Sequence, residues 1–155
     1  MNIFMKRILQ LVIIIVIVLC GRCFAEDLSE MDHIASAEQQ AQRTAALDAA
    51  QAWLETIDLV RYPQSWDMSS VLFQKAVNQE EWVNILSVIR NPLGQTNQRE
   101  QVFIENYTEL PDAPDGEYIV IQYQTDFENR PGSFETVTMM LEEDGTWKGA
   151  GYYIR

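Results

Sequence analysis

The second half of the chain alternates apolar and polar residues with a period of two, whereas the first half follows a longer period. From Gln98 onward, the turn-forming runs "PDAPDG", "NRPG" and "EDG" divide the sequence into strand-like segments. We expect four strands, near residues 99–109, 117–128, 133–142 and 146–155. Because tight turns join antiparallel neighbours and not parallel ones, the pattern predicts a four-stranded antiparallel meander.

The second predicted strand has two distinct faces, because successive side chains point to opposite sides of a sheet. One face is apolar or small and is expected to form core: Ile119, Ile121, Tyr123, Thr125 and Phe127. The other face is mixed: Tyr118, Val120, Gln122, Gln124 and Asp126. We expect the mixed face to be partly open.

Before residue 98, apolar residues recur with the helical period of 3.6. Ser36 and Gln39 have the spacing of a capping box, which predicts that a long helix starts at Ser36. Its apolar stripe is rich in alanine: Ala46, Ala49, Ala50, Trp53, Leu54 and Ile57. A short helix is expected from about Ser69 or Ser70, after a proline turn, and a further amphipathic helix from Asn78 to the run "NPLG".

This order, helices first and strands second, predicts an α+β fold in which N-terminal helices pack on one face of the sheet. Residues 36–155 are expected to form a single domain. The last strand carries Gly149, Ala150 and Gly151 at its centre. Such small residues indicate either a close approach of the alanine-rich helix or a bulge.

The N-terminus has the features of a secretory signal peptide. Lys6 and Arg7 precede an apolar core from Leu11 to Leu19, and Ala25 closes a "CFA" tripeptide. We expect cleavage after Ala25, a flexible lead over residues 26–35, and a periplasmic or secreted product. An uncleaved N-terminal membrane anchor is the alternative.

Cleavage at that point removes both cysteines, Cys20 and Cys23, so the mature chain has no disulfide, thiolate nucleophile or cysteine-bound metal. It also removes three of the 11 basic residues and none of the 23 acidic ones, which changes the net charge from −12 to about −15. A surface of this charge repels nucleic acid and anionic lipid. We therefore expect no nucleic-acid partner and no stable membrane insertion after cleavage.

The sequence contains no recognisable catalytic or metal-binding motif. The one histidine, His33, lies before the expected start of the first helix, and a single histidine without cysteines cannot form a zinc site. The acidic turn residues Asp112, Asp115 and Glu117 lack the spacing of a calcium-binding loop, and turn formation explains them. No catalytic residue, metal or cofactor is predicted.

A carboxylate paired with a tyrosine is the one enzymatic arrangement that the composition allows, because burial can raise the pKa of a carboxyl group into the range of a general base. The residues considered are Asp67, Asp126 and Glu135 with Tyr107 or Tyr123. Nothing in the sequence distinguishes any of them from an ordinary surface carboxylate.

Two surface features are candidates for binding. The mixed face of the second strand combines apolar and amide groups with few charges, which is typical of interface cores: Tyr118, Val120, Gln122 and Gln124. This face is expected either to bind a second copy or an envelope protein, or to be an ordinary solvated surface, and the sequence favours neither. Trp66 lies outside any periodic stripe, so it is expected either to line a pocket mouth or to plug one end of the core.

Several runs resemble the DUF4019 family of small exported bacterial proteins of uncharacterised function: "AWL" at 52–54, "SWD" at 65–67, "RNPLG" at 90–94, "YTELPDAPDGEYIVIQYQTDF" at 107–127 and "ETVTMMLEEDGTWKGAGYYIR" at 135–155. The resemblance implies helices packed on a curved sheet, similar to NTF2-like or cystatin-like folds. It implies no activity, because such folds host enzymes, binders and assembly parts alike.

From these observations we expect an exported, non-catalytic binding or assembly accessory protein of the bacterial cell envelope. The alternative is a small NTF2-like enzyme or ligand binder that uses carboxylate and tyrosine groups in the concave interior between helices and sheet.

Overall fold

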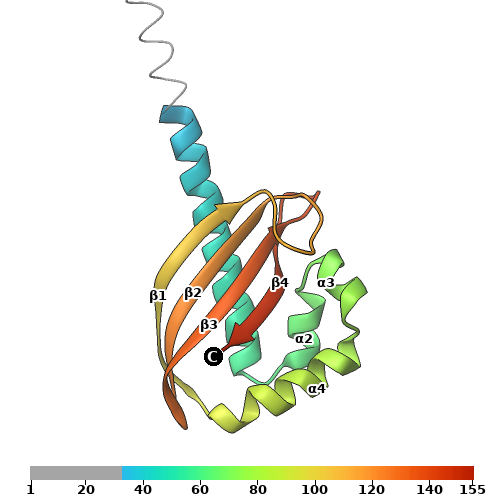
Figure 1. The fold of residues 1–155 in the computed structure, drawn as a ribbon, viewed down its shortest axis with the longest axis vertical. Coiled ribbons are helices and arrows are strands. Elements are labelled where there is room, and N and C mark those ends of the chain that lie inside the picture. The colour runs from blue at the N-terminus through green and yellow to red at the C-terminus, as the bar shows by residue number, and fades with distance from the viewer. Residues whose placement is uncertain (1–32) are drawn as a thin grey trace, which may run out of the picture. The chain divides into compact units, whose positions relative to one another are not determined.

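The computed structural model describes residues 33–155 (Figure 1). The predicted signal peptide, its alternative as a membrane anchor, both cysteines and residues 26–32 of the predicted lead lie outside the described residues. The chain divides after Gln42, and Arg43–Arg155 form one compact unit. In the described chain from residue 33, no helix is both long and apolar enough to cross a membrane.

The first helix is already formed at residue 33 and continues to residue 58. Ser36 therefore does not start the helix, as its capping-box spacing predicted. Its hydroxyl instead donates to the His33 carbonyl oxygen at 2.9 Å, within the helix. A serine inside a helix can donate its hydroxyl to the carbonyl of the preceding turn instead of capping the helix. The prediction was wrong because the helix includes the residues just before Ser36.

Three α-helices and a short 3-10 helix follow: α2 (Tyr62–Asp67), α3 (Val71–Ala76), α4 (Gln79–Ile89) and η1 (Asn91–Leu93). Ser70 caps α3 by accepting from the Phe73 N–H, and Asn78 caps α4 by accepting from the Glu81 N–H. Both starts agree with the sequence prediction. The helix α2 occupies what was predicted as a proline turn, because Pro63 lies in its first turn, where a missing N–H costs nothing.

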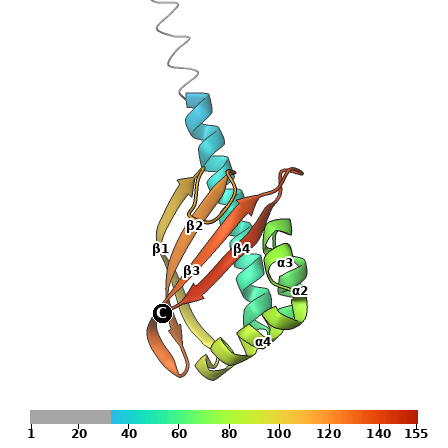
Figure 2. The ribbon, with the colours of Figure 1, turned by 45° about the vertical axis from the view of Figure 1, so that its right-hand side comes forward.

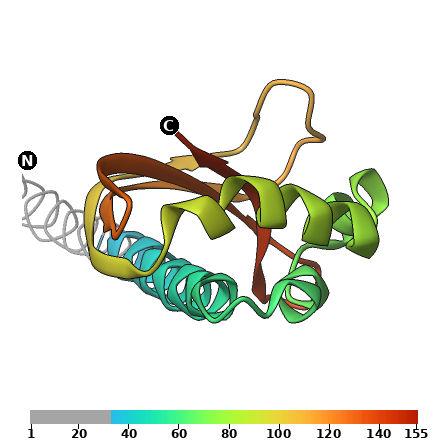
Figure 3. The same ribbon diagram turned by 90° about the horizontal axis from the view of Figure 1, so that it is seen from below.

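The remaining chain forms the predicted antiparallel meander: β1 (Thr96–Tyr107), β2 (Tyr118–Phe127), β3 (Arg130–Leu141) and β4 (Trp147–Ile154), in the order β1-β2-β3-β4. Within residues 43–155, the helices lie against one face of this sheet, here called the inner face (Figures 2 and 3). The α+β prediction is confirmed. The β1–β2 loop lies on the opposite side of the sheet from the first helix (Figure 3).

The core lies between the helices and the inner face. The five residues of β2 that were predicted to form core are all buried: Ile119, Ile121, Tyr123, Thr125 and Phe127. Trp53 of the first helix stacks on Trp82 of α4 at 6.0 Å between ring centroids, and both indole N–H groups donate to Ser65.

Both explanations offered for the glycines of the last strand are correct. A Cβ atom on Gly149 would lie 2.6 Å from the Trp53 ring, so the first helix approaches the strand at this point. The β3–β4 register also shifts between Thr138 and Met139, which leaves Ala150 without a Cα partner. Gly149 further accepts from the Ser70 N–H at 2.8 Å, which joins the start of α3 to β4.

Candidate functional site

A carboxylate with no exposure to solvent lies at the centre of the inner face. Glu135 of β3 is 0% exposed and forms an ion pair with Arg99 of β1, whose Nε lies 2.6 Å from Oε2. The same guanidinium contacts Asp58, at the end of the first helix, with 2.8 Å between Nη1 and Oδ2. The pairing of β1 with β2, and of β2 with β3, brings Arg99 and Glu135 together although 36 residues separate them.

Glu135 is saturated with hydrogen bonds. Arg99 donates to both of its oxygens, Thr125 Oγ1 donates to Oε2 at 2.6 Å, and the Tyr152 hydroxyl donates to Oε1. Burial raises the pKa of Tyr152 well above its ordinary value, and the nearby Glu135 charge adds to the effect. Tyr152 therefore stays a neutral donor, and Glu135 has little capacity left to take a proton from a substrate.

Asp58 joins a second arginine to this cluster. Its Oδ1 lies 2.9 Å from Nη2 of Arg90, which follows α4, and it also accepts from the Thr96 hydroxyl. Burial by itself would raise the pKa of Asp58, but hydrogen bonds from Arg99, Arg90 and Thr96 and the Arg99 charge outweigh burial and hold it below its ordinary value. The two carboxylates and two guanidinium groups balance in charge.

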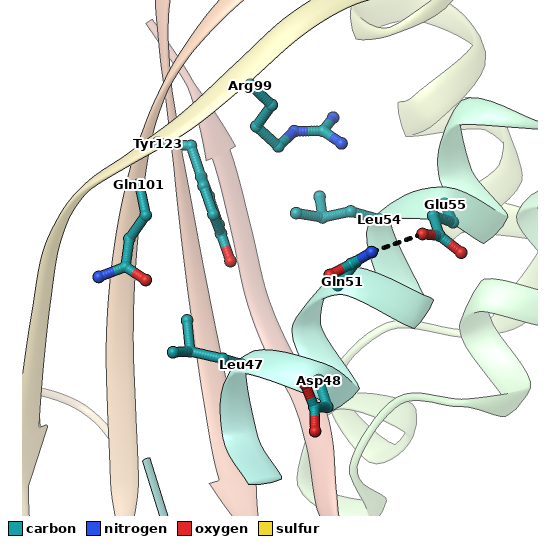
Figure 4. Close-up of a pocket in the computed structure, with 8 residues that line it drawn as sticks. All are labelled: Leu47, Asp48, Gln51, Leu54, Glu55, Arg99, Gln101 and Tyr123. Atoms are coloured by element: carbon teal, nitrogen blue, oxygen red, sulfur yellow. Dashed lines mark hydrogen bonds between the residues drawn. The ribbon is translucent and has the colours of Figure 1, made fainter. Parts of the chain in front are cut away.

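A pocket of about 470 Å³ adjoins the cluster, between the first helix and strands β1 and β2 (Figure 4). We call it the helix–sheet pocket. The helix contributes Leu47, Asp48, Gln51, Leu54 and Glu55, and the strands contribute Arg99, Gln101 and Tyr123. This volume is in the range of small-molecule sites.

Tyr123 is the most informative residue of this pocket. Its side chain is almost entirely buried, since the residue is 8% exposed, and it is the cross-strand partner of Glu135. Within residues 33–155, its hydroxyl makes no hydrogen bond. Burial raises the pKa of Tyr123, Arg99 opposes this shift and Glu135 supports it, so the group is a neutral phenol. A hydroxyl in this position can bind a polar group of a ligand.

Of the residues considered for acid–base chemistry, only Glu135 and Tyr123 meet. Asp67 is exposed and accepts from Gln79, at the end of α2. Asp126, near the end of β2, accepts from the Gly132 N–H near the start of β3, and Tyr107 is 36% exposed on β1. His33 is exposed, and in the described chain no group of three or more His, Cys, Asp or Glu side chains is placed to hold a metal ion.

The predicted interaction face lies on the other side of the sheet. Val120 and Gln122 are half-buried and Gln124 is exposed, but Tyr118 is only 1% exposed. Tyr118 is covered by the β1–β2 loop, because its hydroxyl donates to the Pro114 carbonyl oxygen at 2.7 Å. It is not an accessible contact residue in this structure.

Strand pairing extends this face across the sheet. Phe103, Gln122, Thr136 and Tyr153 form one cross-strand row, and Val120 and Thr138 belong to the next. These six residues are here called the outer sheet face. Phe103 is 42% and Tyr153 is 63% exposed, at opposite edges of the sheet.

Trp66 packs at one end of the core. It is half-buried against the core cluster, and its indole N–H donates to the Val77 carbonyl oxygen at 2.7 Å. Trp66 also does not line the helix–sheet pocket. This packing agrees with the plug, and the pocket-mouth role stays a prediction.

The other charged residues of the cluster around Glu135 were missed by sequence reasoning. Asp58, Arg90 and Arg99 come from three different elements, and no local spacing relates them. One weak signal existed, because Arg99 is a charged residue on the face of β1 that the pairing with Thr125 directs inward.

Comparison with known proteins agrees with this architecture and adds no chemistry. The model of the family described as "Protein of unknown function (DUF4019)" matches residues 49–152. The chain belongs to the DUF4019 family. No curated protein and no solved structure shows a significant match to this DUF4019 chain, so the similarity to NTF2-like or cystatin-like folds stays a prediction.

Proposed function

We propose that this DUF4019 protein is an exported, non-catalytic binding protein of the bacterial cell envelope that holds a small ligand in the helix–sheet pocket. The observation that carries the proposal is the Tyr123 hydroxyl, which borders the pocket without a partner among the described residues although the residue is 8% exposed. The hydroxyl oxygen is not among the fully buried side-chain atoms without a partner in the described chain, so it is accessible at the pocket and can form a hydrogen bond to a ligand.

The saturation of Glu135 favours binding over catalysis. A general base needs an accessible carboxylate with a free acceptor, but Arg99, Thr125 and Tyr152 all donate to this one. The alternative, a small NTF2-like enzyme, would require this cluster to open. The same groups fix the strands that form the wall of the pocket, so a positioning role is enough to explain them.

The location rests on the N-terminal sequence. Its basic residues, apolar core and Ala25 favour export with cleavage, which places the mature domain in the periplasm or outside the cell. A mature chain without cysteine and with a net charge near −15 suits a small acidic protein that stays in solution there.

Native mass spectrometry of the protein, expressed as the full chain and purified gently from its own envelope, tests the proposal. We expect a mass that begins at Glu26 together with a retained small molecule. Gln101→Trp, which fills the pocket from the exposed side of β1, should abolish retention. Gln124→Trp is the matched control on the neighbouring strand, because Gln124 faces away from the pocket, and it should retain the ligand.

A wild-type protein without bound ligand, or a ligand retained equally by Gln101→Trp, would contradict the pocket as the binding site.

A second candidate function is self-association through the outer sheet face. It is favoured by one observation: in a chain with a net charge of −12, the row Phe103, Gln122, Thr136 and Tyr153 carries no charge, although the exposed Glu105 is the β1 partner of Val120 in the next row. Elsewhere, acidic surfaces of two copies would repel each other. The pocket lies on the inner side of the sheet, so dimerisation through the outer face would leave it open.

A further inference from the structure

The charges around the helix–sheet pocket restrict the ligand that it can take, provided that the pocket is the binding site proposed above. Asp48 and Glu55 lie on the exposed side of the first helix, at its border with the pocket (Figure 4). Within residues 33–155, neither forms an ion pair. Gln51 donates to Glu55 Oε1 at 2.9 Å, which leaves the second oxygen of that carboxylate free.

Arg99, the cation that lines the pocket, is already neutralised. It donates to Glu135 with 2.6 Å and 3.2 Å between the atoms, and to Asp58 with 2.8 Å and 3.1 Å. These bonds occupy most of the five N–H groups of its guanidinium. Asp58 and Glu135 together balance Arg99 and Arg90, so Asp48 and Glu55 give the pocket an excess of negative charge.

The remaining lining is suited to an aliphatic chain with amine groups. Leu47, Leu54 and the Tyr123 ring supply apolar contact area. The Tyr123 hydroxyl and the Gln101 carbonyl can accept hydrogen bonds from an ammonium group, and the ring face of a tyrosine attracts cations.

The spacing of the Asp48 and Glu55 carboxylates sets the distance between the positive groups of a ligand that pairs with both. Asp48 and Glu55 are seven residues apart, which corresponds to about 10 Å along a helix and nearly two full turns, so both lie on the same side. A ligand that pairs with both needs two positive groups separated by a comparable distance, with apolar carbon atoms between them. We propose that the helix–sheet pocket binds an aliphatic polyamine, with ammonium groups at Asp48 and Glu55 and its methylene chain along Leu47, Leu54 and Tyr123.

Isothermal titration of the mature protein with spermidine tests this assignment. Pentylamine is the probe with one ammonium group, and glutarate is the probe of opposite charge. Spermidine should bind at least tenfold more tightly than pentylamine, because the second ion pair is lost, and glutarate should not bind. Tyr123→Phe should weaken spermidine binding about fivefold, as expected for one hydrogen bond.

Charge variants separate a specific site from general attraction to an acidic protein. Asp48→Asn combined with Glu55→Gln should weaken spermidine binding more than tenfold. Glu143→Gln is the control, because it removes a charge from an exposed residue in the β3–β4 turn and should change binding less than twofold. Asp48, Glu55 and Glu143 are all exposed, so these variants should keep the fold.

The outcomes distinguish this inference from the proposed function. If the protein binds glutarate or a neutral ligand, and Gln101→Trp abolishes that binding, the polyamine assignment is wrong. The pocket would still be the binding site. If Glu143→Gln and the double variant weaken spermidine binding equally, that binding is a non-specific attraction to an acidic protein. If no probe binds and the envelope-purified protein retains no ligand, both proposals are wrong.

Discussion

Asp58 accepts hydrogen bonds from two arginines and one threonine, and through them it joins the first helix, the end of α4 and strand β1. With Glu135 it forms a group in which two carboxylates balance two guanidinium ions. In such a group, loss of one charge leaves its partner partly buried and uncompensated, which costs more than the pair itself contributes. Removing one charge from this cluster is therefore expected to lower the free energy of unfolding.

Asp58→Asn should lower the free energy of unfolding at pH 7 by about 2 kcal/mol, below the roughly 3–5 kcal/mol for a fully buried pair, because the Asp58 side chain keeps 22% exposure. Urea unfolding followed by tryptophan fluorescence measures the change. Asp48→Asn is the matched control on the same helix, and it should stay within about 0.5 kcal/mol of wild type.

The same residue predicts a dependence on pH. The folded pKa of Asp58 is lowered relative to an unfolded value of about 3.9, so its contribution is complete at pH values well above 4 and is lost as the pH falls through the folded pKa. The difference in stability between wild type and Asp58→Asn should thus shrink on acidification below about pH 4. A difference that stays constant down to pH 2 would show that the Asp58 charge contributes nothing.

Sequence reasoning found part of this site. Glu135 and Tyr123 were considered as a pair, and the β2–β3 register does make them cross-strand neighbours. It did not find Asp58 and Arg99, because their meeting depends on how the first helix lies against β1. That arrangement follows from the whole core and not from any local pattern.

At the scale of elements, a close contact joins the first helix to the last strand. The Trp53 ring occupies the space where a side chain on Gly149 would start, and Trp53 in turn stacks on Trp82 of α4. The helix can lie this close because its facing residues, Ala46 and Ala50, are small and fully buried. Small residues in two elements thus make room for one large ring.

Gly149→Ala should therefore destabilise the fold by about 1–3 kcal/mol, the usual cost of overpacking a core, because its Cβ would lie 2.6 Å from the Trp53 ring. Gly151→Ala, two residues further along the same strand, meets Thr138 at 3.4 Å and should be close to neutral. Thermal unfolding of the two variants makes the comparison. Equal losses of stability would contradict the close approach.

The elements themselves were largely predictable. The period of two located all four strands to within a few residues and assigned the inner face of β2 correctly, because alternating burial leaves a direct trace in sequence. The helix α2 left no such trace. It spans only six residues, Tyr62–Asp67, of which Tyr62 and Ser65 are buried, so it is too short to show a period.

At the scale of the whole molecule, the sheet separates two surfaces with different uses, the helix–sheet pocket on the inner side and the outer sheet face on the other. In a two-fold pairing of outer faces whose axis runs parallel to the strands, the β1 edge of one copy lies over the β4 edge of the other, so Phe103 can meet Tyr153 of the second copy. Aromatic residues at both ends of one row make this face self-complementary.

Val120→Lys should therefore convert a dimer into a monomer, as measured by light scattering coupled to size-exclusion chromatography at physiological salt. Val88→Lys is the control, because Val88 is 72% exposed on α4 and lies away from the outer sheet face, and it should leave the mass unchanged. A wild-type protein that is monomeric at high micromolar concentration would rule out self-association through this face.

The contact between Trp53 and Gly149 also requires that both the first helix and β4 are present before this part of the core can pack. A chain that leaves a ribosome or a translocation pore N-terminus first presents Trp53 long before β4 has emerged, and until then the ring has no strand to pack on. The core depends on contacts between distant parts of the chain, which form late in folding. A partly emerged chain would thus remain unfolded and able to pass through a narrow pore. The core would pack only after β4 has been released.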